Sequence, residues 1–298
     1  MTTSDHSTPQ AASEPLLRVD DLRVSLPTGE RDHVIAVQRV GLQVADGERV
    51  GIVGESGSGK SVTGRAIAGL LPTSPRVRVS GSIRFRGTEM VGAPSAAWDR
   101  IRRHEVGMIF QDPLTFLNPT MRVGRQVAES IPRERRAAGW RSEVLRFLTQ
   151  AGLDDVEAVA QRFPHELSGG MRQRVLIAIA IAKLPALIIA DEPTTALDAT
   201  VQQRVLRTLD ETVSELRTSL ILISHDLAVV AGMTDRIYVM YGGRIVEEGP
   251  TAQVLHAPVH PYTQALLRSV RSLTDPDTPL FSITPQMRRE FTQEVSRA

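Results

Sequence analysis

The feature that most constrains this chain is the stretch from Gly54 to Ser61, which reads Gly-Glu-Ser-Gly-Ser-Gly-Lys-Ser. It matches the pattern G-x-x-x-x-G-K-[ST] of a phosphate-binding loop at every fixed position. The apolar run at residues 50–53 predicts a buried strand before the loop, and apolar residues at helical spacing over residues 62–70 predict a helix after it. A glycine-rich loop that merely ends a strand is the simpler alternative. The order of strand, loop, Lys-Ser pair and helix favours phosphate binding.

The residue types of this loop fit a nucleoside triphosphate. Glycines let the backbone curl so that consecutive N–H groups point at phosphate oxygens, and the following helix directs the positive end of its dipole to the same place. Lys60 supplies a positive charge for the β- and γ-phosphates, and Ser61 offers a hydroxyl to Mg²⁺. The residues predicted here to bind the nucleotide are Gly54, Glu55, Ser56, Gly57, Ser58, Gly59, Lys60 and Ser61.

Composition excludes several other kinds of chemistry. The 298 residues carry a net charge of +1, so there is no strong electrostatic case for nucleic-acid binding. The chain has no cysteine, which excludes disulfides, thiolate metal sites and iron–sulfur clusters. Residues 1–15 are polar, and we expect them to be disordered. The longest apolar stretch, residues 175–190, is too short and interrupted to span a bilayer, so we expect a soluble, intracellular protein.

The first third of the chain predicts antiparallel strands. We expect a first strand over residues 16–26, and residues 83–85 alternate as in a half-exposed strand. Apolar residues also alternate over 40–44, and Asp46-Gly47 is a typical hairpin turn. We therefore expect a hairpin whose second strand, residues 48–53, enters the phosphate-binding loop.

The middle of the chain is helical. Apolar residues recur at helical spacing over residues 123–131 and 143–151, with Gly152 closing the second helix. We expect a separate helical subdomain over about residues 112–182. Helices packed directly on the main sheet fit the same periodicity, which does not fix topology.

A long helix is expected to begin at Ser168 and to run through Ala182. Ser168 is a natural N-cap, and Gly169 and Gly170 leave the first-turn N–H groups bare. This pattern indicates a second anion site at a helix start, with simple capping as the alternative.

Two further buried strands end in polar residues. Residues 187–190 lead into Asp191 and Glu192, and residues 220–223 lead into Ser224 and His225. Carboxylates at the end of a buried strand are costly unless a cation or a reaction uses them. We expect Asp191 to hold Mg²⁺ through water and Glu192 to polarise an attacking water. A hydrogen-bonded strand-end histidine is the ordinary alternative for His225, although ligands of open α/β sheets bind beyond the strand ends.

The last part of the chain predicts a hairpin and a short helix. Residues 237–240 and 244–247 flank Gly242-Gly243, as in a hairpin. After His260-Pro261, residues 262–270 place apolar side chains on one helical face. The remaining tail carries no clear pattern.

The order of these motifs resembles that of the ATP-binding cassette ATPases over residues 16–250. The resemblance rests on six motifs of that family: the phosphate loop, the Q-loop glutamine, the LSGGx signature, the second acidic motif, the D-loop and the switch histidine. In this chain they are Gly54–Ser61, Gln111, Leu167–Met171, Leu187–Glu192, Ala196–Asp198 and His225.

The resemblance implies a fold and a division of the chain. The fold class would be α/β, a P-loop NTPase (RecA-like) core with an antiparallel β subdomain and an α-helical subdomain. The cassette would span residues 16–250, between the tail at 1–15 and a C-terminal extension at 251–298 of the kind found in peptide importers.

The resemblance also implies ATP hydrolysis, with ATP and Mg²⁺ as the bound groups. The catalytic residues would be Glu192 as general base and His225 as a stabiliser of the γ-phosphate, and the metal would be held by Ser61, Gln111 and Asp191. One phosphate loop satisfies one triphosphate, which leaves the helix start at Ser168 without a ligand in its own subunit. The family supplies the answer, because two cassettes face each other and Ser168, Gly169 and Gly170 close over the ATP of the partner.

A narrower resemblance is to the peptide/nickel importer branch of the family. It rests on residues 110–113, 117–119, 194–198 and 259–262, and on Met171 in the signature. It implies a peripheral protein at the cytoplasmic face of the cell membrane that powers import of di- or oligopeptides, or of nickel. Its partners would be a second ATPase subunit, identical or not, two multi-spanning permease subunits and, indirectly, an extracellular substrate-binding protein, with no nucleic acid.

Three features depart from that branch. Leu26 stands where the family usually stacks an aromatic side chain on adenine. The C-terminal tail is short and lacks the clustered cysteines often found there, and Phe116 replaces the usual serine before Leu-Asn-Pro.

The alternative function is a soluble cassette ATPase of the DNA-repair or translation class. Only about a hundred residues separate the phosphate loop from the signature, too few for the long coiled coil of repair members.

Overall fold

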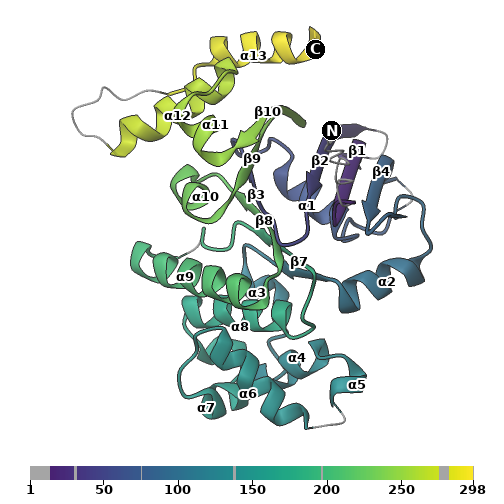
Figure 1. Cartoon of the computed structure of the whole chain (residues 1–298), viewed down its shortest axis with the longest axis vertical. Helices are drawn as coiled ribbons and strands as arrows, with labels where there is room; N and C mark the ends of the chain where they lie inside the picture. The colour runs from purple at the N-terminus through teal and green to yellow at the C-terminus, as the bar shows by residue number, and fades with distance from the viewer. Residues whose placement is uncertain are drawn as a thin grey trace, which may run out of the picture.

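A computed structural model describes residues 14–29, 32–74, 76–136, 139–195, 197–274 and 282–297. These residues form two sheets, one of six strands and one of four, with helices around them (Figure 1). Most of the tail for which we predict disorder, residues 1–13, and Ala196 of the D-loop lie outside the described residues.

The six-stranded sheet has the order β10-β9-β3-β8-β7-β6. From β9 to β6 its strands are parallel, and β10 joins β9 as an antiparallel edge. The strands are β3 (Arg49–Val53), β6 (Val106–Ile109), β7 (Leu187–Asp191), β8 (Ser219–Ser224), β9 (Arg236–Tyr241) and β10 (Arg244–Pro250). The hairpin predicted around Gly242-Gly243 is thereby confirmed.

The four-stranded sheet is antiparallel and has the order β2-β1-β4-β5. Its strands are β1 (Leu17–Pro27), β2 (His33–Val44), β4 (Arg78–Phe85) and β5 (Thr88–Glu89). The strands predicted from the alternating residues 16–26 and 83–85 therefore belong to this sheet.

The predicted hairpin across Asp46-Gly47 is wrong. β2 pairs with β1, whereas β3 pairs with β8 and β9 in the other sheet. The turn is real, with Gly47 at φ 75° and a hydrogen bond of 3.1 Å from Glu48 N to Ala45 O, but it carries the chain between the sheets. Burial explains the difference. β3 is apolar and buried on both faces, as the centre of a parallel sheet requires, and β2 alternates between buried and exposed.

Helices surround the two sheets. They are α1 (Lys60–Ile67), α2 (Ser95–His104), α3 (Pro113–Phe116), α4 (Val123–Ser130), α5 (Arg133–Arg136), α6 (Trp140–Gln150), α7 (Val156–Gln161), α8 (Gly169–Ile181), α9 (Ala199–Leu216), α10 (Leu227–Met233), α11 (Thr251–His256), α12 (Pro261–Thr274) and α13 (Pro285–Arg297). In the described residues no helix combines the length and the apolar character that crossing a membrane would require.

The six-stranded sheet is covered on both faces. Successive residues of β8 point to opposite sides, so that Leu220 and Leu222 join one apolar core and Ile221 and Ile223 join the other. The first core also contains buried residues of α8, α9, α10 and α12, and the second contains those of α1 and of the four-stranded sheet. The helix after the phosphate loop is therefore enclosed between the two sheets.

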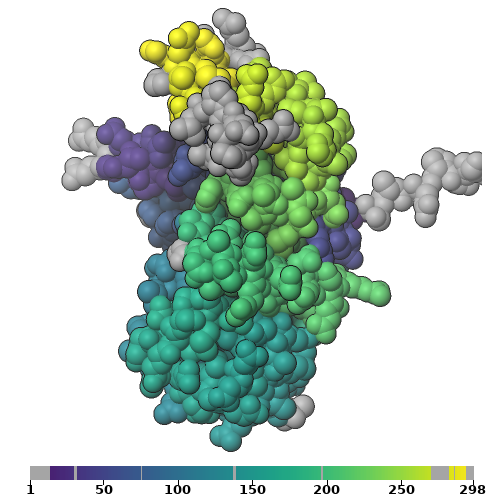
Figure 2. All heavy atoms as spheres, turned by 90° about the vertical axis from the view of Figure 1, so that its left-hand side faces the viewer, coloured from purple at the N-terminus to yellow at the C-terminus, as the bar shows by residue number. Residues whose placement is uncertain are grey.

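Helices α4 to α7 gather at one end of the long axis of the molecule, the bottom of Figure 1, in the teal region of Figure 2. α4, α6 and α7 pack on one another, α4 and α6 also pack on α8, and α8 in turn packs on β6 and α9. Their buried side chains, such as Val127, Phe147 and Leu148, continue the first core. A helical layer thus reaches the main sheet through α8.

The C-terminal tail contains a helix that was not predicted from the sequence. α13 lies beside α12 at the opposite end of the molecule from the helical layer (Figures 1 and 2). Phe291 of α13 is buried against Tyr241 and Tyr262, with ring centroids 5.9 and 5.7 Å away. Met287, four residues before Phe291, is partly buried against the same core, so the two residues have helical spacing. This short pattern was not recognised in the sequence because the other residues of the segment are mostly polar or charged.

Close packing of α10 on β3 predicts a requirement for glycine at position 51. A Cβ on Gly51 would lie 2.4 Å from Val230 Cγ1, so Gly51→Ala should lower the free energy of unfolding by about 1–3 kcal/mol. Gly232, in α10 itself, has no neighbour within 4 Å of such a Cβ, and Gly232→Ala should be neutral or stabilising by up to about 1 kcal/mol. Urea unfolding of both variants measures the difference. Equal stabilities would contradict this account of the packing.

Candidate nucleotide site

Strand register places the predicted site residues at one edge of the six-stranded sheet. Val53, at the end of β3, pairs with Ser224 of β8, and Ile223 of β8 pairs with Asp191 of β7. The residues that follow these strands, the phosphate loop, His225 and Glu192, therefore leave the sheet side by side. This is the edge at which open α/β sheets bind ligands.

The loop has the curled backbone that the glycines predict. Gly54, Gly57 and Gly59 have φ values of 150°, 81° and 101°. A Cβ on Gly59 would lie 2.5 Å from Ala36 O, and one on Gly54 would lie 2.1 Å from Met240 O. Glycine is thus required for the turn and for the close approach of neighbouring backbone.

Lys60 lies inside the loop. Its side chain is buried, and Nζ donates hydrogen bonds of 2.8 Å to the carbonyl oxygens of both Gly54 and Glu55. Burial lowers the pKa of Lys60, while the negative charges of Glu192, Asp191 and Glu55 oppose that shift. A cation held in the curl of the loop fits a triphosphate, because phosphate oxygens are the acceptors that such a loop is built to receive.

Ser61 and Asp191 meet across the site from α1 and β7. The Ser61 hydroxyl donates to Asp191 Oδ1 at 2.7 Å, and Arg65 Nη2 is 3.8 Å from Asp191 Oδ2. Asp191 is 1% exposed, and this burial raises its pKa, opposed by the bond from Ser61 and the charge of Arg65. Two oxygens of this kind fit Mg²⁺, which binds one or two protein oxygens together with phosphates and water. In the described residues there is no group of three or more His, Cys, Asp or Glu side chains that could hold a metal ion.

Glu192 is turned away from its strand neighbour Asp191. Its φ of 47° is in the left-handed region, which is strained for a residue with a side chain, and its N–H donates to Ile223 O at 2.9 Å. The carboxylate accepts a hydrogen bond of 2.8 Å from Thr195 Oγ1 and lies 3.3 Å from His225 Nδ1. The turn therefore directs the carboxylate towards His225 and holds it there.

Gln111 is exposed and follows β6, which pairs with β7 through Ile109 and Ala190. It thus leaves the same edge of the sheet as Glu192, one strand further out. The neighbouring Phe110 carbonyl accepts a hydrogen bond of 3.1 Å from Gln173 of α8. This bond links the Gln111 segment to the signature helix.

The structure does not bring Ser168, Gly169 and Gly170 to the phosphate loop of the same chain. α8 packs on α4, α6, α9 and β6, whereas α1 packs on β7, β8 and the four-stranded sheet, and the two helices lie apart in Figure 1. Ser168 is the N-cap as predicted, because its Oγ accepts from Met171 N at 3.3 Å. Gly170 also has a packing role, since a Cβ there would lie 2.4 Å from Val201 of α9.

Four residues at the site were missed in the sequence. Thr195 holds Glu192, Arg65 faces Asp191, and Tyr262 and Arg288 both contact Glu55. The spacing of Thr195 and Arg65 from recognised motifs was a usable signal. Nothing in the pattern of the tail indicates that Arg288 returns to residue 55.

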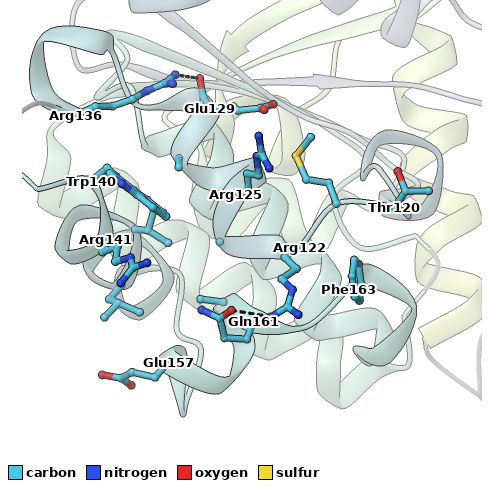
Figure 3. Close-up of a pocket in the computed structure, with 16 residues that line it drawn as sticks. Thr120, Arg122, Arg125, Glu129, Arg136, Trp140, Arg141, Glu157, Gln161 and Phe163 are labelled. Atoms are coloured by element: carbon cyan, nitrogen blue, oxygen red, sulfur yellow. Dashed lines mark hydrogen bonds between the residues drawn. The ribbon is translucent and has the colours of Figure 1, made fainter.

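A groove of about 1110 Å³ lies elsewhere, among α4, α6 and α7 (Figure 3). Its rim is rich in arginine, with Arg122, Arg125, Arg136 and Arg141 beside two glutamates. None of the predicted site residues lines it.

Two family models match the chain. The model described as "ABC transporter" matches residues 37–195, more than half of the chain, and the model described as "Oligopeptide/dipeptide transporter, C-terminal region" matches residues 246–294. The first contains the phosphate loop, the signature and Asp191-Glu192. The second contains α12 and most of α13.

Curated relatives are similar over nearly the whole chain. The oligopeptide transport ATP-binding protein OppD of Bacillus subtilis is 45% identical over 87% of this chain and 72% of its own length. The probable D,D-dipeptide transport ATP-binding protein DdpD of Escherichia coli is 46% identical over 86% of this chain and 78% of its own.

Solved structures agree. The dimeric ATP-binding cassette MJ0796, in a post-hydrolysis state bound to ADP and Pi, has a TM-score of 0.67 and 27% identity over 79% of this chain and 98% of its own. CbiO1 from Clostridium perfringens, part of a transporter complex, has a TM-score of 0.66 and 25% identity over 88% and 96%. Fold, site edge and relatives thus agree that this chain has the α/β fold of a P-loop NTPase and belongs to the ATP-binding cassette family of ATP-hydrolysing transport proteins, in its oligopeptide/dipeptide branch.

Proposed function

We propose that this chain hydrolyses ATP to power the import of di- or oligopeptides. The observation that supports this most is the double match, since the nucleotide-binding region and the C-terminal region both resemble those of peptide transport proteins. We further propose the division made from the sequence, a cassette over residues 16–250 with helical residues 112–182, followed by an extension at 251–298.

Within one subunit, we assign binding to the phosphate loop and chemistry to the strand ends. Lys60 and the loop N–H groups would bind the β- and γ-phosphates, and Ser61, Asp191 and Gln111 would hold Mg²⁺. When bound, Mg²⁺ would neutralise negative charge on the triphosphate. The 2.7 Å bond between Ser61 and Asp191 supports this assignment, because it joins two hard oxygen ligands at the mouth of the loop.

Glu192 is the proposed general base. Its carboxylate is held by Thr195 and lies 3.3 Å from His225, so it can take a proton from a water placed between it and the γ-phosphate. His225, which is 56% exposed at its side chain, would stabilise the γ-phosphate from the neighbouring strand end. The carboxylate and the imidazole would thus act on the γ-phosphate from two neighbouring strand ends.

We propose that a second cassette, identical or not, completes the site. Ser168 is exposed and caps α8 without meeting the phosphate loop of its own chain. Facing a partner, Ser168, Gly169 and Gly170 would bind the γ-phosphate of the partner's ATP through bare N–H groups. The dimeric cassette bound to ADP and Pi supports this pairing.

We place the permease contact beside Gln111. Leu114 and Phe116 of α3 are 56% and 44% exposed, and Phe116 stacks on Phe110 with ring centroids 3.6 Å apart. An exposed apolar pair next to Gln111 suits a cytoplasmic segment of one of two multi-spanning permease subunits. The chain would then be peripheral at the cytoplasmic face of the membrane and would meet an extracellular binding protein only through the permease.

The soluble-ATPase alternative is not favoured. The relatives are transport proteins, and the C-terminal region also matches a transporter model. The net charge of +1 gives no reason to propose nucleic acid as a partner.

Uptake in cells tests the function. Deletion of the gene should abolish uptake of labelled di- or oligopeptides, and wild-type protein should restore it while Glu192→Gln should not. Unchanged uptake of all the peptides tested would contradict the proposal. Loss of nickel uptake alone would replace the peptide cargo with the metal.

Replacing the general base should separate binding from turnover. Glu192→Gln keeps the size of the side chain but cannot accept the proton, so the rate of phosphate release should fall by about 10²–10⁴-fold. ATP affinity should change little. The matched control is Glu215→Gln on an exposed position of α9, which should hydrolyse ATP normally. Wild-type turnover by Glu192→Gln would remove Glu192 from the role of base.

Blocking the signature should spare nucleotide binding in the isolated subunit. Ser168→Arg places a bulky cation at the start of α8, and if this surface closes over a partner's ATP, hydrolysis should fall by roughly 10²-fold or more. Equilibrium ATP binding to the monomer should stay within about twofold, because the phosphate loop lies elsewhere in the chain. Ser142→Arg, at an exposed first-turn position of α6, is the control. Hydrolysis at the wild-type rate by Ser168→Arg would disprove the shared site.

Removing the buried charge of Asp191 should make the protein more stable but weaken its Mg²⁺-dependent ATP binding. Because burial raises the folded-state pKa of Asp191, its ionisation weakens the fold as pH rises above the ordinary value of 3.8. Asp191→Asn should therefore unfold at a higher urea concentration than wild type at pH 7 without nucleotide, and this advantage should vanish well below pH 3.8. The Mg²⁺-dependent part of ATP affinity should fall. A variant less stable than wild type at pH 7 would contradict this account.

A further inference from the structure

The C-terminal extension reaches back to the phosphate loop at Glu55. Tyr262 of α12 is fully buried, and its Oη accepts a hydrogen bond of 2.8 Å from the backbone N–H of Glu55. Burial raises the pKa of Tyr262, so its phenol stays neutral at physiological pH. A loop amide is therefore paired with a side chain from more than 200 residues away.

The start of α12 is built to hold Tyr262 in this place. The Glu247 carboxylate of β10 accepts hydrogen bonds from Val259 N at 2.8 Å and His260 N at 3.0 Å. His260 Nδ1 then accepts from Tyr262 N at 3.1 Å. These contacts give a structural role to the Val-His-Pro-Tyr segment at 259–262, which the proposed chemistry leaves without one.

α13 contacts the same loop residue through its side chain. The Arg288 guanidinium donates two hydrogen bonds to the Glu55 carboxylate, at 2.6 and 3.0 Å. Tyr241 Oη donates to Arg288 O at 2.9 Å, and the Tyr241 ring is tilted by 45° against the Tyr262 ring, with the centroids 4.5 Å apart. The fork geometry fixes both carboxylate oxygens, and the aromatic rings fix the helix that supplies the arginine.

Glu55 is thus held on two sides. From the extension, Tyr262 holds its N–H and Arg288 holds its carboxylate; from within the loop, Lys60 Nζ donates to its carbonyl. Of the two contacts from the extension, the one from Tyr262 is the stronger constraint, because the Tyr262 side chain is fully buried, whereas the Arg288 side chain is 49% exposed and water screens its charge.

We propose that Tyr262 and Arg288 are positioning residues that hold the phosphate loop in its nucleotide-receiving conformation. A loop fixed before binding loses less conformational entropy when the triphosphate arrives, so the extension raises ATP affinity without touching the nucleotide. The proposal rests on the phosphate-loop assignment made above. It makes the extension part of the nucleotide site.

The position of Glu55 predicts which kinetic parameter should change. The loop binds the phosphates in the ground state and the transition state alike, so loss of its support should raise KM and the nucleotide dissociation constant while leaving kcat nearly unchanged. A purely structural defect would act differently. It would reduce the folded fraction and so lower kcat at unchanged KM.

Tyr262→Phe is the direct test, because it removes the hydroxyl and keeps the ring. The dissociation constant for ATP and KM should each rise roughly tenfold, the effect of leaving a partly buried N–H unpaired. Tyr238→Phe is the matched control. Tyr238 is equally buried and its hydroxyl also bonds a backbone, that of Gln43 at 3.0 and 3.1 Å, but away from the loop. It should leave both constants unchanged.

A second pair of variants keeps the test decisive if Tyr262→Phe fails to fold. Arg288→Met should raise the dissociation constant about two- to threefold at low salt, with the difference shrinking in high salt, and exposed Arg289→Met should not. Wild-type affinity in both Tyr262→Phe and Arg288→Met, or a lower kcat alone, would overturn the proposal. Because binding is read without turnover, a wild-type protein that binds ATP but does not hydrolyse it would refute the proposed function and leave this proposal standing.

Discussion

Val53 pairs with Ser224, and Ile223 pairs with Asp191, in a register that three parallel strands share. A slip of one residue would turn each strand over, moving Ile223 from one core to the other and Asp191 from the site into an apolar layer. The burial of β7 and β8 on both faces makes such a slip prohibitive. The register therefore fixes where the phosphate loop, the acidic pair and His225 can meet, and the chemistry depends on it.

That register gathers charges where water is scarce. Lys60 and Asp191 are both nearly inaccessible to solvent. Burial lowers the pKa of Lys60 and raises the pKa of Asp191, which in each case favours the neutral form. Each partly offsets the shift of the other, and Ser61 and Arg65 add further compensation at Asp191. Burying these charges costs folding stability in the unbound protein, although the neighbouring charges and hydrogen bonds offset part of the cost. Bound nucleotide and metal would offset more of it, so stability and function compete while the site is empty of both.

The sequence correctly predicted the phosphate loop with the strand before it and the helix after it, the acidic end of the strand at Asp191, and the N-cap at Ser168. These features follow from local residue types and from the spacing of apolar residues. Prediction from the sequence failed where the outcome depended on tertiary context. Asp46-Gly47 has the residues of a hairpin turn, but only the double-sided burial of β3 reveals that this strand belongs to another sheet. The contact of Arg288 with Glu55 joins residues 233 apart, and no periodicity of either segment encodes it.

The segment after Glu192 connects the chain's own nucleotide site to the start of α8, which would face the nucleotide of a partner. Thr195 holds the Glu192 carboxylate. A little further along, Leu197 and Val201 pack closely on the start of α8: a Cβ on Gly169 would lie 3.2 Å from Leu197 Cδ2, and one on Gly170 would lie 2.4 Å from Val201 Cγ1. The base of a chain's own site and the helix start that would serve its partner's site therefore share one short stretch of backbone. In the pairing proposed above, a shift of this stretch on hydrolysis would be felt at α8, and hence at the other nucleotide. Close glycine contacts transmit such a shift because they leave no space to absorb it.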